Sequence, residues 1–216
     1  MIPVILTDRE VRVLGCLIEK EVTTPDYYPL SLNALRNACN QTSNREPVLA
    51  LDEATVADAL ETLKQKNLVL QDNFSRVAKF EEVFLKTTRL MPPEAAIMCV
   101  LMLRGPQTGG ELRTRTERLH GFDTSDAVSA TLQQLQEWAY VTLLPRQVGK
   151  KEPRYAHLLS GPPEMKPEEK PALPRSAVSD FVAENEAFIK LQSEVASLRQ
   201  EHEDLKQAFL DFKAQF

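Results

Sequence analysis

The stretch Thr55–Leu70, TVADALETLKQKNLVL, decides how the chain folds. Its apolar residues recur at the spacing of one helical face as far as Leu63, and a short β-type apolar run ends the stretch. The same pattern returns at 127–143, AVSATLQQLQEWAYVTL, where Val128 takes the place of Val56. A unit that occurs twice is an internal repeat, so the fold must be built from two copies of it.

Two further helical patterns precede each copy, and a second strand pattern follows it. Three helices followed by a hairpin is the order of a winged helix-turn-helix. We therefore expect a mainly α fold with small β-hairpins (α+β), made of two tandem winged helix-turn-helix domains plus a C-terminal coiled-coil helix. The expected parts are winged-helix domain 1 at 1–90, winged-helix domain 2 at 91–161, a Pro-rich linker at 162–175 and the C-terminal helix at 176–216.

Composition indicates an ordinary water-soluble protein. Of 216 residues, 43% are hydrophobic and 26% are charged. The longest apolar run, 95–103, is far shorter than the roughly 18 residues that a membrane span needs. The opening MIPVIL has neither a basic flank nor a cleavage site, so we expect no signal peptide, no membrane and a cytoplasmic location.

Local signals predict several element boundaries. Thr7 and Glu10 form the pattern of a capping box at the start of the first helix. Ser31, Asp52, and either Thr124 or Ser125 are expected to cap later helices. The pattern also predicts a second strand over 77–85 in the first unit and an arginine-rich helix over 111–119 in the second.

Cysteine and histidine patterns argue against redox, metal and catalytic chemistry. Cys16, Cys39 and Cys99 are odd in number and lie within apolar helical patterns, so we expect small buried side chains rather than disulfides. The three histidines have no ligand spacing, and no Gly-rich phosphate loop, GxSxG or HExxH is present. We expect no metal, no cofactor and no enzyme activity.

Beyond the proline-rich linker, apolar residues repeat every seven positions with charged residues between them. About five such heptads favour a coiled coil, and hence a homodimer. The alternative is one long helix packed back on the globular part. The expected dimerisation residues are Phe181, Phe188, Leu191, Val195, Leu198, His202, Leu205, Phe209 and Phe212.

Two longer stretches resemble a known family. These are YPLSLNALRNACNQTSNREPV, at residues 28–48, and GPQTGGELRTRTERLHGF, at residues 105–122. Together they closely resemble the YceH family of bacterial proteins, over residues 5–160 or so. The resemblance implies tandem winged-helix units and no established activity.

Charge distribution makes the second unit the better candidate for binding duplex DNA. Residues 1–90 hold 11 basic and 13 acidic side chains (net −2), and residues 91–161 hold 8 and 7 (net +1). In a winged helix, the third helix normally enters the major groove and the wing touches the backbone. Polar side chains there can read base edges, and cations can neutralise phosphates. The candidate DNA-binding residues are Arg113, Arg115, Arg118, Thr124, Ser125, Ser129, Gln133, Arg146, Lys150, Lys151 and Arg154.

Interleaved acids leave a different class of function open. Glu111, Glu117 and Glu152 can pair with these cations and make an ordinary solvated surface. The same fold then serves as a protein–protein adaptor without direct DNA contact. The first unit is the weaker DNA candidate because acids such as Asp52 and Asp58 lie on its third helix, and we expect it to contribute dimer or interdomain packing.

The polar loop at 40–46 is the remaining candidate for a specific site. Its amides, hydroxyls and arginine can bind a phosphate, a peptide or the neighbouring unit. The alternative is that they satisfy the loop's own backbone through Asx and Ser/Thr turns. The candidate residues are Asn40, Gln41, Ser43, Asn44 and Arg45.

Overall fold

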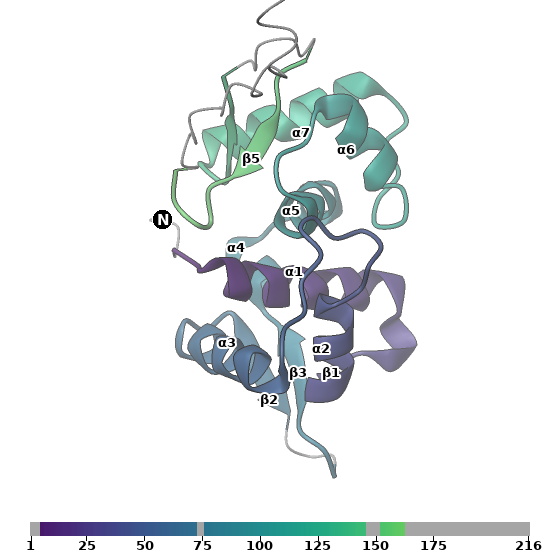
Figure 1. The fold of residues 1–216 in the computed structure, drawn as a ribbon. Coiled ribbons are helices and arrows are strands. Elements are labelled where there is room, and N and C mark those ends of the chain that lie inside the picture. The colour runs from purple at the N-terminus through teal and green to yellow at the C-terminus, as the bar shows by residue number, and fades with distance from the viewer. Residues whose placement is uncertain (1–4, 73–75, 146–151, 163–216) are drawn as a thin grey trace, which may run out of the picture. The chain divides into compact units, whose positions relative to one another are not determined.

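A computed structural model describes residues 5–72, 76–145 and 152–162, which belong to one compact unit (Figure 1). Helices and small antiparallel sheets alternate along it, so the fold is mixed α/β. No helix in this part of the chain is long and apolar enough to cross a membrane.

The first half contains three helices and a hairpin, as the repeat predicts. The hairpin strands β2 and β3 are antiparallel, and a short strand β1 pairs with the other edge of β3. The elements are α1 (Asp8–Thr23), a 3-10 turn η1 (Pro25–Tyr27), β1 (Leu30–Ser31), α2 (Leu32–Cys39), α3 (Glu53–Gln65), β2 (Val69–Asp72) and β3 (Lys79–Glu82).

The second half repeats this order after a short connecting helix, α4. Strands β4 and β5 form a separate two-stranded antiparallel sheet. The elements are α4 (Phe84–Thr88), α5 (Pro92–Arg104), α6 (Gly109–Arg115), α7 (Ser125–Glu137), β4 (Val141–Leu143) and β5 (Tyr155–His157).

The predicted helix starts are confirmed. Thr7 and Glu10 exchange both hydrogen bonds of a capping box at the start of α1. The side chains of Ser31, Asp52 and Thr124 each accept a hydrogen bond from the backbone N–H three residues later. These caps satisfy amides that the first turn of a helix otherwise leaves unpaired.

Two predicted elements differ from the structure. The strand expected over 77–85 ends at Glu82, because the Glu82 carboxylate accepts the Leu85 N–H at 2.9 Å and so supports the turn into α4. The helix expected over 111–119 is α6, which begins earlier, after the N-cap Thr108, and ends at Arg115. After it, the Thr116 hydroxyl donates back to the Leu112 carbonyl at 2.8 Å.

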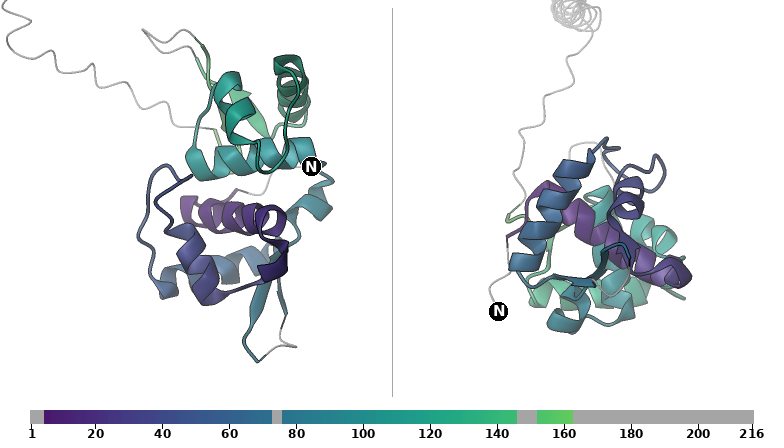
Figure 2. Two further views of the ribbon diagram at one scale, coloured as in Figure 1. Left: turned by 90° about the vertical axis from the view of Figure 1, so that its right-hand side faces the viewer. Right: turned by 90° about the horizontal axis from the view of Figure 1, so that it is seen from below.

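Helices α1 and α5 join the two halves into one core (Figures 1 and 2). Gly15 of α1 permits their close approach, since a Cβ built there would lie 3.0 Å from the Leu103 side chain. The buried Cys99 thiol lies 3.5 Å from the Gly15 carbonyl at the same contact. Cys16, Cys39 and Cys99 are all buried free thiols, which confirms the prediction for them.

Several predictions fall outside the described residues. These are the linker 162–175, the C-terminal helix 176–216, and all the dimerisation residues: Phe181, Phe188, Leu191, Val195, Leu198, His202, Leu205, Phe209 and Phe212. The division of the repeat units at residue 90 stays a prediction.

Candidate nucleic-acid interface

Helix α7 carries a polar face that none of the described residues covers. Its apolar residues Val128, Leu132 and Leu135 are buried, and the helix packs against α5, α6 and β4. Since residues four apart share a helical face, the other side presents one row of side chains. Thr124, Ser125, Ser129 and Gln133 are all exposed on it.

This row is partly engaged in contacts within the helix. The Thr124 hydroxyl accepts the Ala127 N–H at 3.2 Å, and the Ser129 hydroxyl donates to the Ser125 carbonyl at 3.0 Å. The Gln133 amide donates to Glu137 at 3.3 Å. The helix itself contains two acids and no lysine or arginine. Any cation that meets a phosphate must therefore come from neighbouring segments.

Arg113 lies at the N-terminal end of α7 although it belongs to α6. Its guanidinium donates to the carbonyls of Phe122 at 3.3 Å and Asp123 at 2.8 Å, in the loop directly before the Thr124 cap. The Arg113 residue is still exposed. The arginine therefore orders the entry to α7 and adds positive charge beside it.

Arg115 and Arg154 gather around one carboxylate, Glu111. Arg154 lies 3.1 Å from Glu111 and also donates to the Pro106 carbonyl at 2.7 Å, whereas Arg115 lies 3.8 Å from Glu111 and bonds to Gln107. Burial opposes ionisation of Glu111, but the Thr108 amide and the two arginines lower its pKa. Two cations on one carboxylate leave the cluster with a net positive charge.

Arg118, in the turn after α6, is the least constrained of these cations. It is exposed and forms no hydrogen bond or ion pair with any described residue. Arg146, Lys150 and Lys151 lie outside the described residues. The structure thus places Arg113 beside α7 and brings Arg115 and Arg154 together on Glu111. Arg118 has no partner in the described part of the chain.

The matching face of the first unit is acidic. Helix α3 exposes Glu53, Asp58 and Glu61, and its Lys64 lies 2.7 Å from Glu61. Arg36 of α2 lies 3.9 Å from Glu53. Phosphates near this face would meet like charges. That the first unit is the weaker candidate for DNA stays a prediction.

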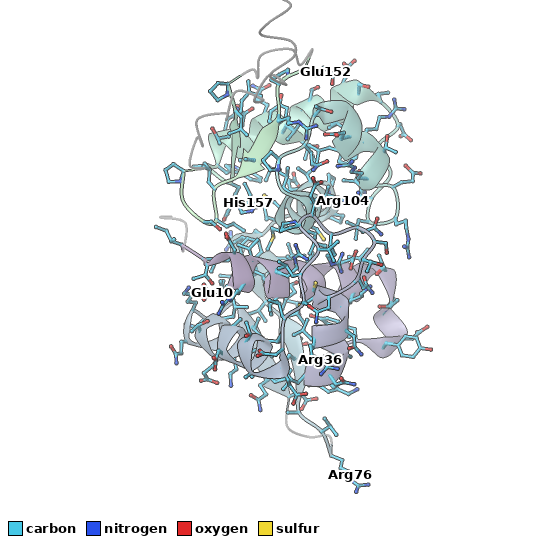
Figure 3. The ribbon with its side chains drawn as sticks, in the orientation of Figure 1. Glu10, Arg36, Arg76, Arg104, Glu152 and His157 are labelled. Carbon is cyan, nitrogen blue, oxygen red and sulfur yellow. The ribbon has the colours of Figure 1, made fainter. Side chains whose placement is uncertain are left out.

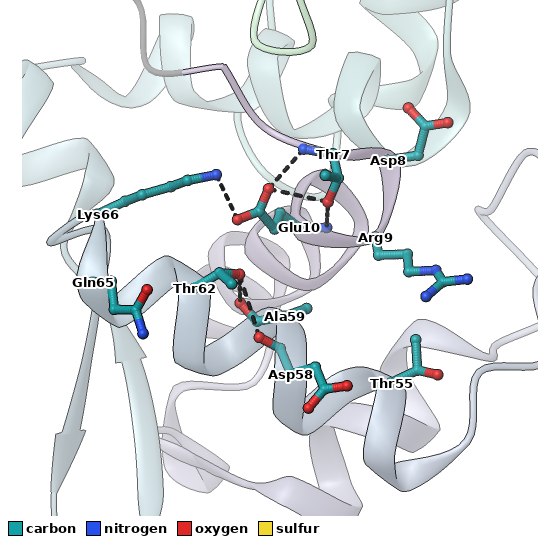
Figure 4. A pocket seen from close by; sticks show the side chains of 10 residues that line it. All are labelled: Thr7, Asp8, Arg9, Glu10, Thr55, Asp58, Ala59, Thr62, Gln65 and Lys66. Carbon is teal, nitrogen blue, oxygen red and sulfur yellow. Dashed lines mark hydrogen bonds and ion pairs between the residues drawn. The ribbon is translucent and has the colours of Figure 1, made fainter.

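A groove of about 650 Å³ runs between the start of α1 and α3 (Figure 4). At its centre the buried Glu10 carboxylate accepts hydrogen bonds from the Thr7 N–H at 2.7 Å and from Lys66 Nζ at 2.6 Å. Burial would raise the pKa of Glu10, but Lys66 and Thr7 lower it. Because the protein itself saturates this carboxylate, the groove fixes α1 on α3 rather than offering charge to a ligand.

The polar loop at 40–46 is held by buried contacts. Arg45 has a fully buried side chain, and its guanidinium donates to both Glu19 carboxylate oxygens, at 3.1 and 2.6 Å. Its remaining donors reach Gln41 Oε1 and the carbonyls of Ala38 and Asn44. All five N–H donors of this arginine are used inside the protein.

Other residues of the loop bond to distant segments. Asn40 exchanges two hydrogen bonds with Leu51, at 2.7 and 2.8 Å, and so closes the loop. Asn44 accepts from Arg104, and the Glu46 N–H donates to the Leu103 carbonyl at 2.9 Å. Ser43 is exposed. The loop therefore ties the first half to the end of α5.

Sequence reasoning missed the partners of this loop. Arg12 is also buried, and it donates to the carbonyls of Cys39 at 3.2 Å and Pro47 at 2.7 Å. Arg12 and Glu19 lie in the first helical pattern and Arg104 in a later one, all far from 40–46 in the sequence. The one feature of the sequence that could have indicated these buried contacts is the charged Arg12 on the apolar side of the first helix.

A family model described as "Protein of unknown function, DUF480" matches residues 6–150. The chain belongs to the DUF480 family. Similar chains carry the name UPF0502 protein: one from Geotalea uraniireducens is 52% identical over 214 residues, and one from Pelobacter propionicus is 50% identical over 215, each covering 98% of both chains. A UPF0502 protein of Geobacter sulfurreducens is 50% identical over 216 residues and covers 99% of both chains.

In this DUF480 chain the matched range contains α7, Arg113, Arg118 and the 40–46 loop, whereas β5 and Arg154 follow it. The names of the relatives give a family and no activity. The function must therefore be argued from the site.

Proposed function

We propose that this DUF480 protein is a tandem winged-helix protein, in line with its resemblance to the YceH family, that binds duplex DNA as a cytoplasmic regulator. Helix α7 and the hairpin β4–β5 of the second unit form the DNA-binding surface. The role is one of binding and not of catalysis. The homodimer expected from residues 176–216 belongs to the proposal, because two-fold symmetry presents two copies of α7 to two half-sites.

The observation that carries the proposal is the uncovered polar face of α7. Ser125, Ser129 and Gln133 lie four residues apart on a helix whose opposite side is buried. Hydroxyl and amide groups on an exposed helical face can donate to and accept from base edges in the major groove. The helix has no cation of its own, so its affinity for DNA depends on the arginines around it.

The arginines of the second unit supply charge of the required sign. Arg113 lies at its N-terminal end, and the pair Arg115 and Arg154 exceeds the single charge of Glu111. Each phosphate that a cation neutralises releases a counterion and steepens the salt dependence of binding. Arg118 is the best single probe of this effect, since its side chain holds no described contact whose loss would disturb the fold.

The test is binding of the purified full chain to random duplex DNA, followed by fluorescence anisotropy across a salt series. Arg118→Gln is expected to weaken binding at low salt and to reduce the log–log salt slope by about 0.9 for one lost phosphate contact. Arg76→Gln is the matched control, because Arg76 projects from the tip of the first hairpin, away from α7 (Figure 3). It should leave the slope unchanged.

A second variant changes Arg146, Lys150, Lys151 and Arg154 together to Gln and should weaken binding further. Absence of binding at low salt would contradict the proposal. So would salt-dependent binding that neither variant weakens more than Arg76→Gln does.

The acidic face of α3 favours a second candidate function, that of a protein–protein adaptor. Glu53, Asp58 and Glu61 repel phosphates but suit a basic protein surface. If DNA binding is absent, this becomes the leading function. Changing Asp58 and Glu61 to Asn and Gln would then weaken the partner complex in a salt-dependent way.

A further inference from the structure

A second cavity lies where the two repeat units and their connecting helix meet. It measures about 340 Å³, near the lower end of the range of about 300–1,000 Å³ that ligand sites occupy. Side chains of α1, β3, α4, α5 and the segment after α6 line it. Its walls are mostly apolar, with Ile18, Leu85, Leu90, Ala96 and Leu119 among them. A ligand seated there would touch both halves of the protein.

Two carboxyl groups interrupt this apolar wall. Glu21 comes from the end of α1, and Glu82 from the end of β3. Glu82 is only 2% exposed, and one oxygen of Glu21, Oε2, is buried without a hydrogen-bond partner. A buried polar atom without a partner loses its hydration and gains nothing in return, so a native site that keeps one calls for an explanation.

The described residues supply no cation to either carboxyl. Within the described residues, neither Glu21 nor Glu82 forms an ion pair, and Lys86, which also lines the cavity, is exposed and pairs with neither. Glu82 instead accepts the Leu85 N–H at 2.9 Å, and its backbone N–H donates to the Tyr28 hydroxyl at 2.6 Å.

The state of Glu82 reflects this lack of a positive neighbour. Burial raises the pKa of Glu82 to about 8, and a hydrogen bond to the adjacent Glu21 carboxyl and the charge of that carboxyl add to the rise, although the Leu85 amide opposes it. Elsewhere in the fold, the buried Glu10 and the half-buried Glu19 are each paired with a lysine or arginine. The cavity is therefore a place where a buried carboxyl pair lacks the counter-charge that comparable carboxyls have.

We propose that this cavity binds a small organic cation, a protonated amine on an apolar body, with the ammonium group against Glu21 and Glu82. An ammonium group offers three donors, enough for the unpartnered Glu21 oxygen and for Glu82. The apolar body replaces water against Leu85, Leu90 and Ala96. The site does not depend on DNA binding, and it makes the junction between the two units responsive to a ligand.

The probe is n-hexylamine, added to the uniformly ¹⁵N-labelled full chain at pH near neutrality and followed by amide chemical shifts. Shifts are expected at Val22, Leu85 and Ala96, with a dissociation constant in the millimolar range or tighter. Hexan-1-ol has the same apolar body without the charge. It should bind at least about tenfold more weakly, because a hydrogen bond to a charged group contributes about 1.5–3 kcal/mol. Hexanoate should not bind.

Variants locate the charge that binds the amine. Glu21→Gln should weaken hexylamine binding by about tenfold or more. Glu82→Gln keeps an oxygen for the Leu85 N–H, and its effect should be smaller because Glu82 itself holds a proton near neutral pH. Glu61→Gln, an exposed carboxylate on α3, is the matched control and should change nothing. If Glu82→Gln fails to fold by circular dichroism, Glu21→Gln, on a less buried residue, decides the question.

Three results would overturn the proposal. One is the absence of shifts at the cavity amides with millimolar hexylamine. Another is equal binding of hexan-1-ol, which would show a merely apolar cavity. The third is unchanged amine affinity in Glu21→Gln.

Discussion

At the scale of single residues, Arg45 does more than its position in a polar loop suggests. Its five donors join Glu19, Gln41 and the carbonyls of Ala38 and Asn44. Arg45→Lys keeps the charge but has three donors and no planar fork, so it leaves buried acceptors unpaired. We expect it to lower the free energy of unfolding by about 2–4 kcal/mol, measured by urea denaturation.

The control for Arg45 is Arg36→Lys. Arg36 is a half-buried residue of α2 whose carboxylate partner, Glu53, lies 3.9 Å away. An exposed pair of this kind contributes about 0–1 kcal/mol. Equal effects of the two substitutions would contradict a special role for Arg45.

Residue patterns could not reveal this role. The letters of 40–46 predict a polar loop, and the loop is there. However, the carboxylate that Arg45 binds belongs to Glu19, 26 residues earlier in the chain, and Asn44 accepts a hydrogen bond from Arg104, 60 residues later. Only the packing of α1 against α5 brings these segments together. The same holds for Glu21 and Glu82, whose separate patterns give no sign of a shared cavity.

At the scale of elements, Gly15 sets how closely α1 approaches α5. A Cβ there would lie 3.0 Å from Leu103 Cδ2 and 3.2 Å from Met102 Cβ, inside an already packed core. Gly15→Val adds branched bulk at this contact, and we expect it to lower the free energy of unfolding by about 1–3 kcal/mol, measured by thermal or urea unfolding. Gly110→Val on α6 is the control, since its nearest neighbour is 4.0 Å away. A stabilising Gly15→Val would refute this explanation.

Element boundaries were predictable where their signals are local. The caps at Thr7, Asp52 and Thr124 depend on a partner three residues away, so the sequence contains the whole motif. Helix α4 was missed because the alternating pattern of 77–85 is typical of a strand. The turn into the helix is supported by the Glu82 carboxyl group, which is buried in a part of the fold where α1 and Tyr28 contact β3.

At the scale of the whole molecule, the buried Glu82 and the half-buried His157 should give the free energy of unfolding an unusual pH dependence. Burial and Glu21 raise the pKa of Glu82 to about 8, while burial lowers the pKa of His157 to about 4 against the opposing charge of Asp8. Between about pH 4.3, the carboxyl pKa of the unfolded chain, and about pH 8, native Glu82 therefore keeps a proton that the unfolded chain has lost. The contribution of Glu82 to the free energy of unfolding is fully present at low pH and is lost as the pH rises towards 8.

His157 acts in the opposite direction in a lower window. As the pH falls, His157 of the unfolded chain is protonated near pH 6.5, whereas native His157 stays neutral until about pH 4. The contribution of His157 to the free energy of unfolding therefore falls as pH decreases through that range. The two effects offset each other between about pH 4.5 and 6.5. Above that range the effect of Glu82 is no longer offset by His157. Among the described residues, Glu21, Lys86 and Cys99 are the other titratable groups that line the cavity, and the Tyr28 hydroxyl accepts the Glu82 N–H.

We therefore expect the free energy of unfolding to fall by about 2 kcal/mol between pH 6.5 and 8, at about 1.4 kcal/mol per unit for one proton. Glu82→Gln is neutral throughout and should remove the fall, whereas Glu61→Gln should keep it. Urea unfolding at several pH values in this window provides the measurement. Glu21→Gln removes the adjacent carboxyl charge and should move the fall to lower pH, because the pKa of Glu82 then drops. A wild-type profile that is flat or rising between pH 6.5 and 8 would mean that Glu82 is ionised in the folded protein, and that its counter-charge comes from a group other than the described residues.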